Sequence, residues 1–198
     1  MAQTIALEPP ARWATPDDAD ALAELINFAG EGLPAYLWER MAEPGETIWD
    51  VGRRRARREE STFSYRNAVV AEQEGAVVAC LLGYPLPDEP VAIGDDMPPM
   101  FVPMQELENM AVGTWYVNVL ATYPEHRNRG HGRRLLALAE RIAEERGCRG
   151  LSIIVFDTNH DARRLYERCG YRASGARRLV KEDWVHPSEE GVLLVKPL

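Results

Sequence analysis

The sequence predicts an α/β (α+β) fold that contains one parallel strand–helix–strand crossover and one antiparallel β-hairpin. The crossover is predicted by a strand-like segment at 114–122, an amphipathic helical segment that ends near residue 146, and the apolar run LSIIVF at 151–156. Two strands that are joined through a helix in this way lie parallel in a sheet. The hairpin is predicted by two apolar segments that flank Glu74-Gly75. With 198 residues, of which 45% are hydrophobic, the chain is expected to form one domain over 1–198.

The first half of the chain is predicted to open with helices. Thr15 precedes Pro16 and two aspartates, and a capping hydroxyl, a proline and acidic side chains suit the first turn of a helix. This helix is expected to end at Gly30. The other elements expected in this half are a second helix at about 47–60, hairpin strands at about 67–73 and 76–84, and an irregular insertion at 85–112, interpreted as a lid, with a short helix over 100–109.

The second half is predicted to alternate strands and helices. The segment GTWYVNVLAT alternates apolar and mixed positions, as a strand requires. Gly147 and Gly170 are expected to end two helices. The elements expected here are a strand at 114–122, a helix from the glycine turn to about 146, a strand at 151–156, a short helix opened by Asn159-His160-Asp161, and strands at about 171–181 and 191–196.

The charge and the apolar patterning exclude several classes of protein. A net charge of -8 means that the surface as a whole repels nucleic acid and anionic lipid, so an anion site must be local. No apolar run is long enough to span a membrane and the first residues do not resemble a signal peptide, so a cytoplasmic protein is expected. The three cysteines and four histidines lack ligand spacing, which predicts thiols buried in the core and no metal site.

The basic run RRRARR at 53–58 has two interpretations. It could bind nucleic acid, or it could form a solvated helix face. The second interpretation is favoured because Glu59-Glu60 follow the run and the chain is acidic as a whole.

The turn at 127–134, RNRGHGRR, predicts an anion site. A helix start leaves its first N–H groups unpaired and carries a positive dipole end. Gly130 and Gly132 remove side chains that would keep a ligand away from these amides, and four arginines add positive charge. An ordinary strand-to-helix turn with exposed arginines would give the same residues, so from the turn alone both interpretations stay open.

Residues 119–172 resemble the coenzyme A-binding core of the GNAT superfamily of N-acetyltransferases. Three features carry the resemblance: the turn RNRGHG, Asn159 at the head of the next helix, and LYERCGY seven residues later. The resemblance implies a mixed, mostly antiparallel sheet with a central parallel crossover and helices on both faces. It also implies acetyl-CoA as co-substrate and an amine as acceptor, with homodimerisation as a possibility.

The resemblance assigns roles to individual residues. The amides from Arg129 to Arg133 would hold the coenzyme's pyrophosphate, and the backbone of Leu120 and Thr122 would hold its pantetheine arm. Tyr166 would protonate the departing thiolate, although a core aromatic would share its spacing. Asn159 would meet the pantetheine, cap its helix, or do both. The full set of implied coenzyme contacts is Leu120, Ala121, Thr122, Arg127, Asn128, Arg129, Gly130, His131, Gly132, Arg133, Asn159, Arg163 and Tyr166.

A base is also needed, because a primary amine, with a pKa of about 10.4, is mostly protonated when it arrives. The resemblance implies that a main-chain N–H near Thr122 would stabilise the oxyanion. The candidates for the base are Glu106, Glu108, Tyr116 and Asn118, and Glu108 is preferred. A solvated position on a short helix is the alternative for Glu108. A Cys-His-Asp triad of Cys169, His160 and Asp161 is rejected, because a thiol on a short helix behind the tyrosine suits the core.

These inferences predict an enzyme that moves an acetyl group from acetyl-CoA to a primary amine by direct attack in a ternary complex. The alternative is a module that binds coenzyme A without turnover, as a sensor or an assembly subunit. A nucleic-acid-binding domain built on 53–58 is a third class. The sequence does not identify the acceptor.

Overall fold

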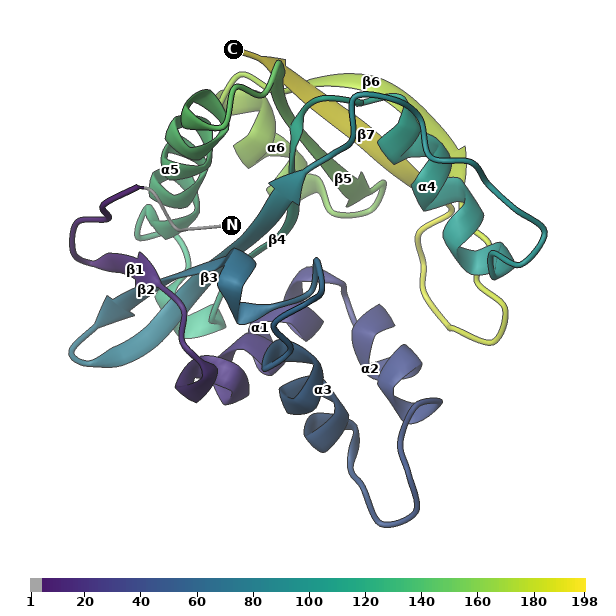
Figure 1. Ribbon diagram of the computed structural model, residues 1–198, viewed down its shortest axis with the longest axis horizontal. Coiled ribbons are helices and arrows are strands. Elements are labelled where there is room, and N and C mark those ends of the chain that lie inside the picture. Colours follow the sequence, from purple (N-terminus) through teal and green to yellow (C-terminus); the bar gives the residue numbers. More distant parts are fainter. Residues whose placement is uncertain (1–4) are drawn as a thin grey trace. The chain divides into compact units, whose positions relative to one another are not determined.

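The computed structural model describes residues 5–198 and contains a seven-stranded sheet with the strand order β1-β2-β3-β4-β5-β7-β6 (Figure 1). The strands are β1 (Ala11–Trp13), β2 (Ala68–Gln73), β3 (Ala76–Pro85), β4 (Trp115–Thr122), β5 (Gly150–Phe156), β6 (Arg172–Arg178) and β7 (Glu190–Pro197). The helices are α1 (Ala19–Ala29), α2 (Leu33–Glu39), α3 (Ile48–Ala56), α4 (Val102–Asn109), α5 (His131–Glu145) and α6 (His160–Arg168).

The strand pairing is mixed, as the sequence predicts. β4 and β5 are parallel, with Trp115 opposite Leu151 and Val117 opposite Ile153. The pairs β1–β2, β2–β3, β5–β7 and β6–β7 are antiparallel. The hairpin turn at Glu74-Gly75 has positive φ at both residues, 55° and 81°, the conformation that matches the twist of the flanking strands. The predicted fold class and hairpin are therefore confirmed.

The chain divides into two compact units that interleave along the sequence. The first unit contains the residues up to Tyr84 together with Asn118–Leu136, and the second contains Pro85–Val117 and Ala137–Leu198. β4 and α5 each begin in one unit and end in the other. The prediction of one domain with a lid at 85–112 stays a prediction.

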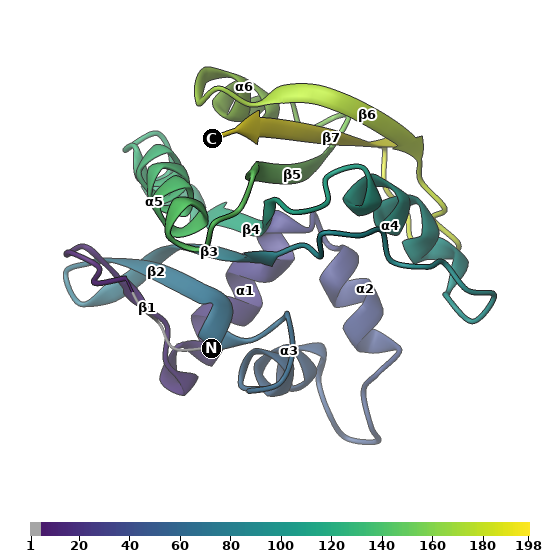
Figure 2. The ribbon, with the colours of Figure 1, turned by 45° about the horizontal axis from the view of Figure 1, so that its top comes forward.

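In the first unit, α1 and α3 pack together and cover an apolar core. Figures 1 and 2 show α1, α2 and α3 side by side. Apolar side chains of these helices pack with β2, β3 and the second half of β4, where Val119 and Ala121 contribute. The core residues of α1 lie three and four apart, as an amphipathic helix requires: Leu22, Ala23, Leu25 and Ile26.

Two elements of the first unit were not predicted, and one prediction was too long. β1 has three residues and α2 has seven, so neither is long enough to show a reliable period. α3 ends at Ala56 and not near residue 60. Side chains bind the carbonyl groups that follow it: Asn67 Nδ2 donates to the carbonyls of Ser61 and Thr62, at 3.2 and 3.0 Å.

The arginines of the RRRARR segment contact acidic side chains of the same unit. Arg53 lies 3.0 Å from Asp20 and 2.6 Å from Asp50, and Arg54 pairs with Glu46. Neighbouring carboxylates therefore compensate part of this positive charge, in keeping with the preferred interpretation of a solvated helix face.

In the second unit, α4 packs on β6 and β7 (Figure 2). Two glycines of these strands lie next to methionine side chains: a Cβ at Gly175 would lie 2.6 Å from Met110 Cε, and one at Gly191 would lie 2.7 Å from Met104 Cε. The insertion before α4 is held to it by Asn109, whose amide donates to the Val91 carbonyl and accepts from the Val91 N–H, both at 2.8 Å. The predicted helix over 100–109 is thus present as α4 and the turn before it.

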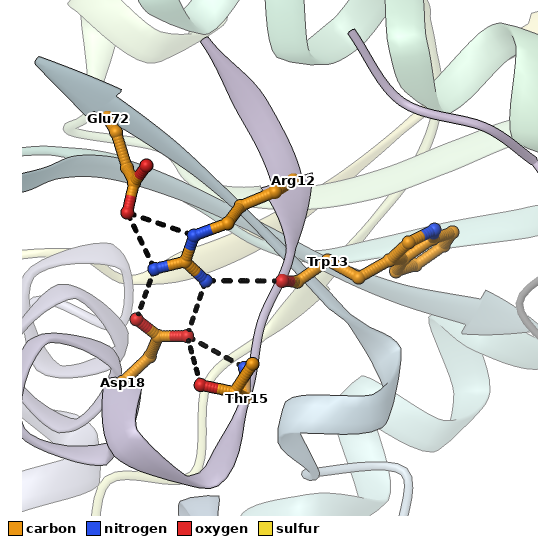
Figure 3. A network of polar contacts seen from close by, with 5 residues as sticks. All are labelled: Arg12, Trp13, Thr15, Asp18 and Glu72. Carbon is orange, nitrogen blue, oxygen red and sulfur yellow. Dashed lines mark hydrogen bonds and ion pairs between the residues drawn. The ribbon is translucent and has the colours of Figure 1, made fainter. Parts of the chain in front are cut away.

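The start of the first unit is held by a partly buried ion pair (Figure 3). Arg12 of β1 donates two hydrogen bonds to Asp18, each 2.8 Å, and a further pair to Glu72 of β2. Asp18 also accepts from the N–H of Thr15, at 2.7 Å. Burial opposes ionisation of Asp18, but the bonds from Arg12 and Thr15 outweigh it and lower the pKa of the carboxyl.

We expect the substitution Asp18→Ala to lower the free energy of unfolding by about 1–3 kcal/mol, because Arg12 and the Thr15 N–H lose their acceptor. Urea unfolding at pH 7 measures this. The neighbouring substitution Asp17→Ala, at an exposed position, is the control and should change little. Folding lowers the pKa of Asp18. The stability difference between the wild type and Asp18→Ala should therefore shrink as the pH falls from the ordinary pKa of an aspartate through the lowered pKa of Asp18. Equal stabilities of the two variants at pH 7 would contradict the prediction.

Candidate functional site

The turn between β4 and α5 exposes unpaired backbone donors. Asn128 and Gly130 have positive φ, 60° and 85°, and this left-handed backbone turns the chain into α5. The N–H of Arg134 donates to the carbonyl of Gly130, at 3.1 Å, which is the first i to i−4 bond of the helix. The N–H groups of residues 131–133 therefore have no partner within α5, and the helix dipole adds positive potential there.

The side chains around this turn are positive. Arg127 donates to the carbonyl of Thr122, at 3.2 Å, and so ties the turn to the end of β4. Arg129 and Arg133 are exposed, and within residues 5–198 neither forms an ion pair. His131 is buried, 7% exposed. Burial and then the neighbouring cations lower the pKa of His131. These features suit a site for a phosphate-bearing ligand.

The second half of β4 has one edge turned away from β3. The N–H of Tyr123, directly after β4, donates to the carbonyl of Val78 on β3, at 3.0 Å. Backbone N–H groups alternate between the two edges of a strand. Those of Leu120 and Thr122 are therefore directed to the opposite edge, which is where the sequence analysis expects an extended ligand to bind. Ala121 is 8% exposed and its side chain belongs to the core of the first unit.

The three predicted residues of the α6 segment lie in the second unit and have different surroundings. Asn159 caps α6, because its side-chain oxygen accepts from the N–H of Ala162 at 3.1 Å. Arg163 is paired with Glu167, at 2.9 Å. Tyr166 is 6% exposed and packs against Tyr171, with 6.1 Å between the ring centroids.

The two glutamates of α4 differ in their surroundings. Glu106 forms an ion pair with Arg177 of β6, at 2.6 Å. Glu108 is partly buried, and burial raises the pKa of its carboxyl to about 7. A carboxylate with such a pKa can accept a proton at neutral pH. Of the two, the surroundings favour Glu108 as the base.

The other two candidates for the base lie on β4. Tyr116 is buried, 6% exposed. The side-chain amide of Asn118 donates to the hydroxyl of Tyr84 on β3, at 3.4 Å. No local signal in the sequence indicates Tyr84, because only the pairing of β3 and β4 brings it together with Asn118.

The thiols are not arranged for nucleophilic catalysis. Burial raises the pKa of Cys80 to about 12. Cys148 and Cys169 are only partly buried, which corrects the expectation that all three thiols lie in the core. Asp161 pairs with Arg164 on the surface of α6.

Within residues 5–198, no group of three or more His, Cys, Asp or Glu side chains could hold a metal ion. In the same range, no helix has the length and apolar character needed to span a bilayer.

The predicted site residues therefore form two groups. The residues of β4 from Leu120 onward and the whole turn as far as Arg133 belong to the first unit. The second unit holds Glu108, Asn159, Arg163 and Tyr166. Each group is built on regular elements: β4 and α5 position the first, and α4 and α6 position the second.

Comparison with known proteins assigns these features to a family. The model of the acetyltransferase (GNAT) family matches residues 33–171, a range that includes both groups. A mycothiol acetyltransferase of Acidimicrobium ferrooxidans is 30% identical over 165 residues, which are 82% of this chain and 43% of the relative. The chain thus spans less than half the length of that relative.

Solved structures share the fold. One described as an acetyltransferase aligns with a TM-score of 0.65 at 20% identity, covering 94% of this chain and 98% of that one. An N-acetyltransferase from Staphylococcus aureus Mu50 aligns with a TM-score of 0.62 at 19% identity, covering 93% and 98%. At these identities the likeness concerns the fold alone.

Proposed function

Because the chain belongs to the acetyltransferase (GNAT) family, we propose that it transfers an acetyl group from acetyl-CoA to a primary amine. The observation that carries the proposal is the turn at the start of α5. It combines N–H groups without a partner in α5, a left-handed Gly130, and the side chains of Arg129 and Arg133, which form no ion pair with any residue of 5–198; all lie inside the matched range. The acidic remainder of the surface would repel a phosphate ligand, so this turn is the place where one would be held.

In this proposal the coenzyme binds along β4 and the turn. The amides from Arg129 to Arg133 hold the pyrophosphate, and Arg127 and Asn128 shape the turn. The backbone of Leu120, Ala121 and Thr122 lies along the pantetheine arm, and a main-chain N–H near Thr122 stabilises the oxyanion. The remaining contacts come from the α6 segment: Asn159, Arg163 and Tyr166.

The acetyl group moves by direct attack. Glu108 takes a proton from the ammonium form of the acceptor, and the free amine attacks the thioester carbonyl. The nitrogen of the tetrahedral intermediate then gives up a second proton to solvent, the C–S bond breaks as the intermediate collapses, and Tyr166 donates its hydroxyl proton to the departing sulfur. The surroundings of the cysteines support direct transfer, because the Cys80 thiol is buried and stays protonated near neutral pH.

The experiment that tests this function follows free thiol while the protein is incubated with acetyl-CoA and a panel of amines. The panel should contain small amines, aminoglycoside-type antibiotics, peptide termini and lysine-bearing proteins. We expect thiol release that depends on one class of acceptor. Tight coenzyme binding by calorimetry with no acceptor-dependent release would instead support the alternative, a coenzyme A-binding module without turnover.

The role of the turn predicts a specific defect in the variant Gly130→Ala. Gly130 and Gly45 have nearly the same φ, 85° and 90°, and a Cβ at either position would meet no atom within 4 Å. Alanine should therefore destabilise both sites equally, by about 1–2 kcal/mol. Only Gly130→Ala should also raise the dissociation constant of acetyl-CoA, by about tenfold, because its methyl group separates the phosphates from the amides. Calorimetry on both variants measures this, and equal affinities would contradict the assignment.

The role of Glu108 predicts a pH profile. Because the carboxylate is the active form and burial raises the pKa of Glu108 in the free protein to about 7, kcat/KM for the amine should increase from pH 6 to pH 8 and then level off. In Glu108→Gln we expect kcat to fall by about 100-fold and this acid limb to disappear. The variant Glu106→Gln breaks the ion pair with Arg177 and is the matched control, which should keep the acid limb. An unchanged limb in Glu108→Gln would reject Glu108 as the base.

A further inference from the structure

The end of α6 places a second tyrosine against the proposed acid. The N–H of Tyr171 donates to the carbonyl of Tyr166 and the N–H of Gly170 to that of Glu167, both at 3.1 Å. With Gly170 at φ 95°, this is a Schellman motif, which brings the residue after the glycine back onto the last turn of the helix. The ring centroids of Tyr166 and Tyr171 consequently lie 6.1 Å apart, and the ring planes are inclined by 54°.

The contact between the two rings does not require the hydroxyl of Tyr171. A phenylalanine would make the same ring contact. Tyr171 is 2% exposed, and among the described residues its hydroxyl oxygen has no hydrogen-bond partner, the Tyr166 hydroxyl included. A buried hydroxyl without a partner destabilises the folded state, and this one belongs to a ring that packs against the proposed acid.

The charged groups around Tyr171 leave its O–H available as a donor. Glu140 of α5 and Lys196 of β7 pair with each other at 2.6 Å, and the Lys196 side chain lies over Gly170, 3.5 Å from where its Cβ would stand. Burial, followed by the neighbouring Tyr166, Cys169 and Glu140, raises the pKa of Tyr171 well above its ordinary value. Tyr171 therefore keeps its proton throughout the range in which such an enzyme would be assayed.

We propose that Tyr171 is a positioning residue for Tyr166, and that its hydroxyl donates a hydrogen bond to the phenolate that Tyr166 becomes during transfer. The inference rests on the proposed function, in which the Tyr166 proton passes to the coenzyme sulfur. The negative charge then lies on the Tyr166 oxygen, the Tyr171 proton stays covalently bound, and solvent returns a proton to Tyr166 after the products leave. A hydrogen bond to the charged form lowers the pKa of an acid, so Tyr171 would make Tyr166 a better proton donor.

The test is a double-mutant cycle of Tyr166→Phe, Tyr171→Phe and the double variant. Phenylalanine keeps the ring contact, so urea unfolding should show Tyr171→Phe to be at least as stable as the wild type. We expect Tyr171→Phe to lower kcat by about tenfold at neutral pH, without changing the KM for acetyl-CoA. In the Tyr166→Phe background, the substitution Tyr171→Phe should not lower kcat further, because residue 166 then forms no phenolate. The alkaline limb of kcat should move to higher pH in Tyr171→Phe, because the pKa of Tyr166 rises.

The matched control is Tyr36→Phe. The hydroxyl of Tyr36 in α2 is also buried without a partner, and its removal should leave kcat unchanged. If Tyr166→Phe slows the reaction and Tyr171→Phe does not, the inference about Tyr171 is wrong and the acid role of Tyr166 stands. If Tyr171→Phe lowers kcat equally in both backgrounds, the inference is also wrong. If Tyr166→Phe itself has no effect, the acid role of Tyr166 in the proposed function is what fails.

Discussion

The backbone N–H groups that α5 leaves unbonded at its first turn are the feature on which the proposed chemistry depends. They exist because a helix cannot pair its first donors internally. They are accessible because Gly130, with φ 85°, carries no side chain at the turn. In a chain with a net charge of -8, this turn and its arginines form a local positive region. The protein can thus attract a polyanionic ligand to one place while the rest of its surface repels it.

Backbone geometry at a glycine also organises the end of α6. The Schellman motif at Gly170 determines where Tyr171 lies relative to Tyr166. Two glycines therefore perform related tasks in the two units. Gly130 precedes α5, whose first amides have no partner within the helix, and Gly170 ends α6 so that two tyrosine rings meet. In both cases the left-handed conformation is the requirement, and glycine meets it without the strain that a Cβ introduces.

In the second unit, burial changes the pKa of one of two neighbouring glutamates. Glu106 and Glu108 are two residues apart on α4, yet one forms an ion pair with Arg177 and the other is desolvated. Desolvation favours the neutral form of a carboxyl, which brings the pKa of Glu108 close to the pH at which a base is useful. α4 packs on β6 and β7, and Arg177 of β6 is the partner of only one of these two chemically identical side chains.

The sequence by itself determined the elements whose signals are local. The hairpin at Glu74-Gly75, the capped turn before α1, the capped start of α6, the glycine turn and the parallel β4–β5 crossover all follow from patterns in single segments of the chain. The tertiary structure alone decided the short strand β1, the early end of α3, the distinction between Glu106 and Glu108, and the contact of Asn118 with Tyr84. The physical reason is that strand pairing, desolvation and side-chain bonds to distant carbonyls depend on residues far apart in the chain. Their effect on a local segment appears only when the partners are brought together.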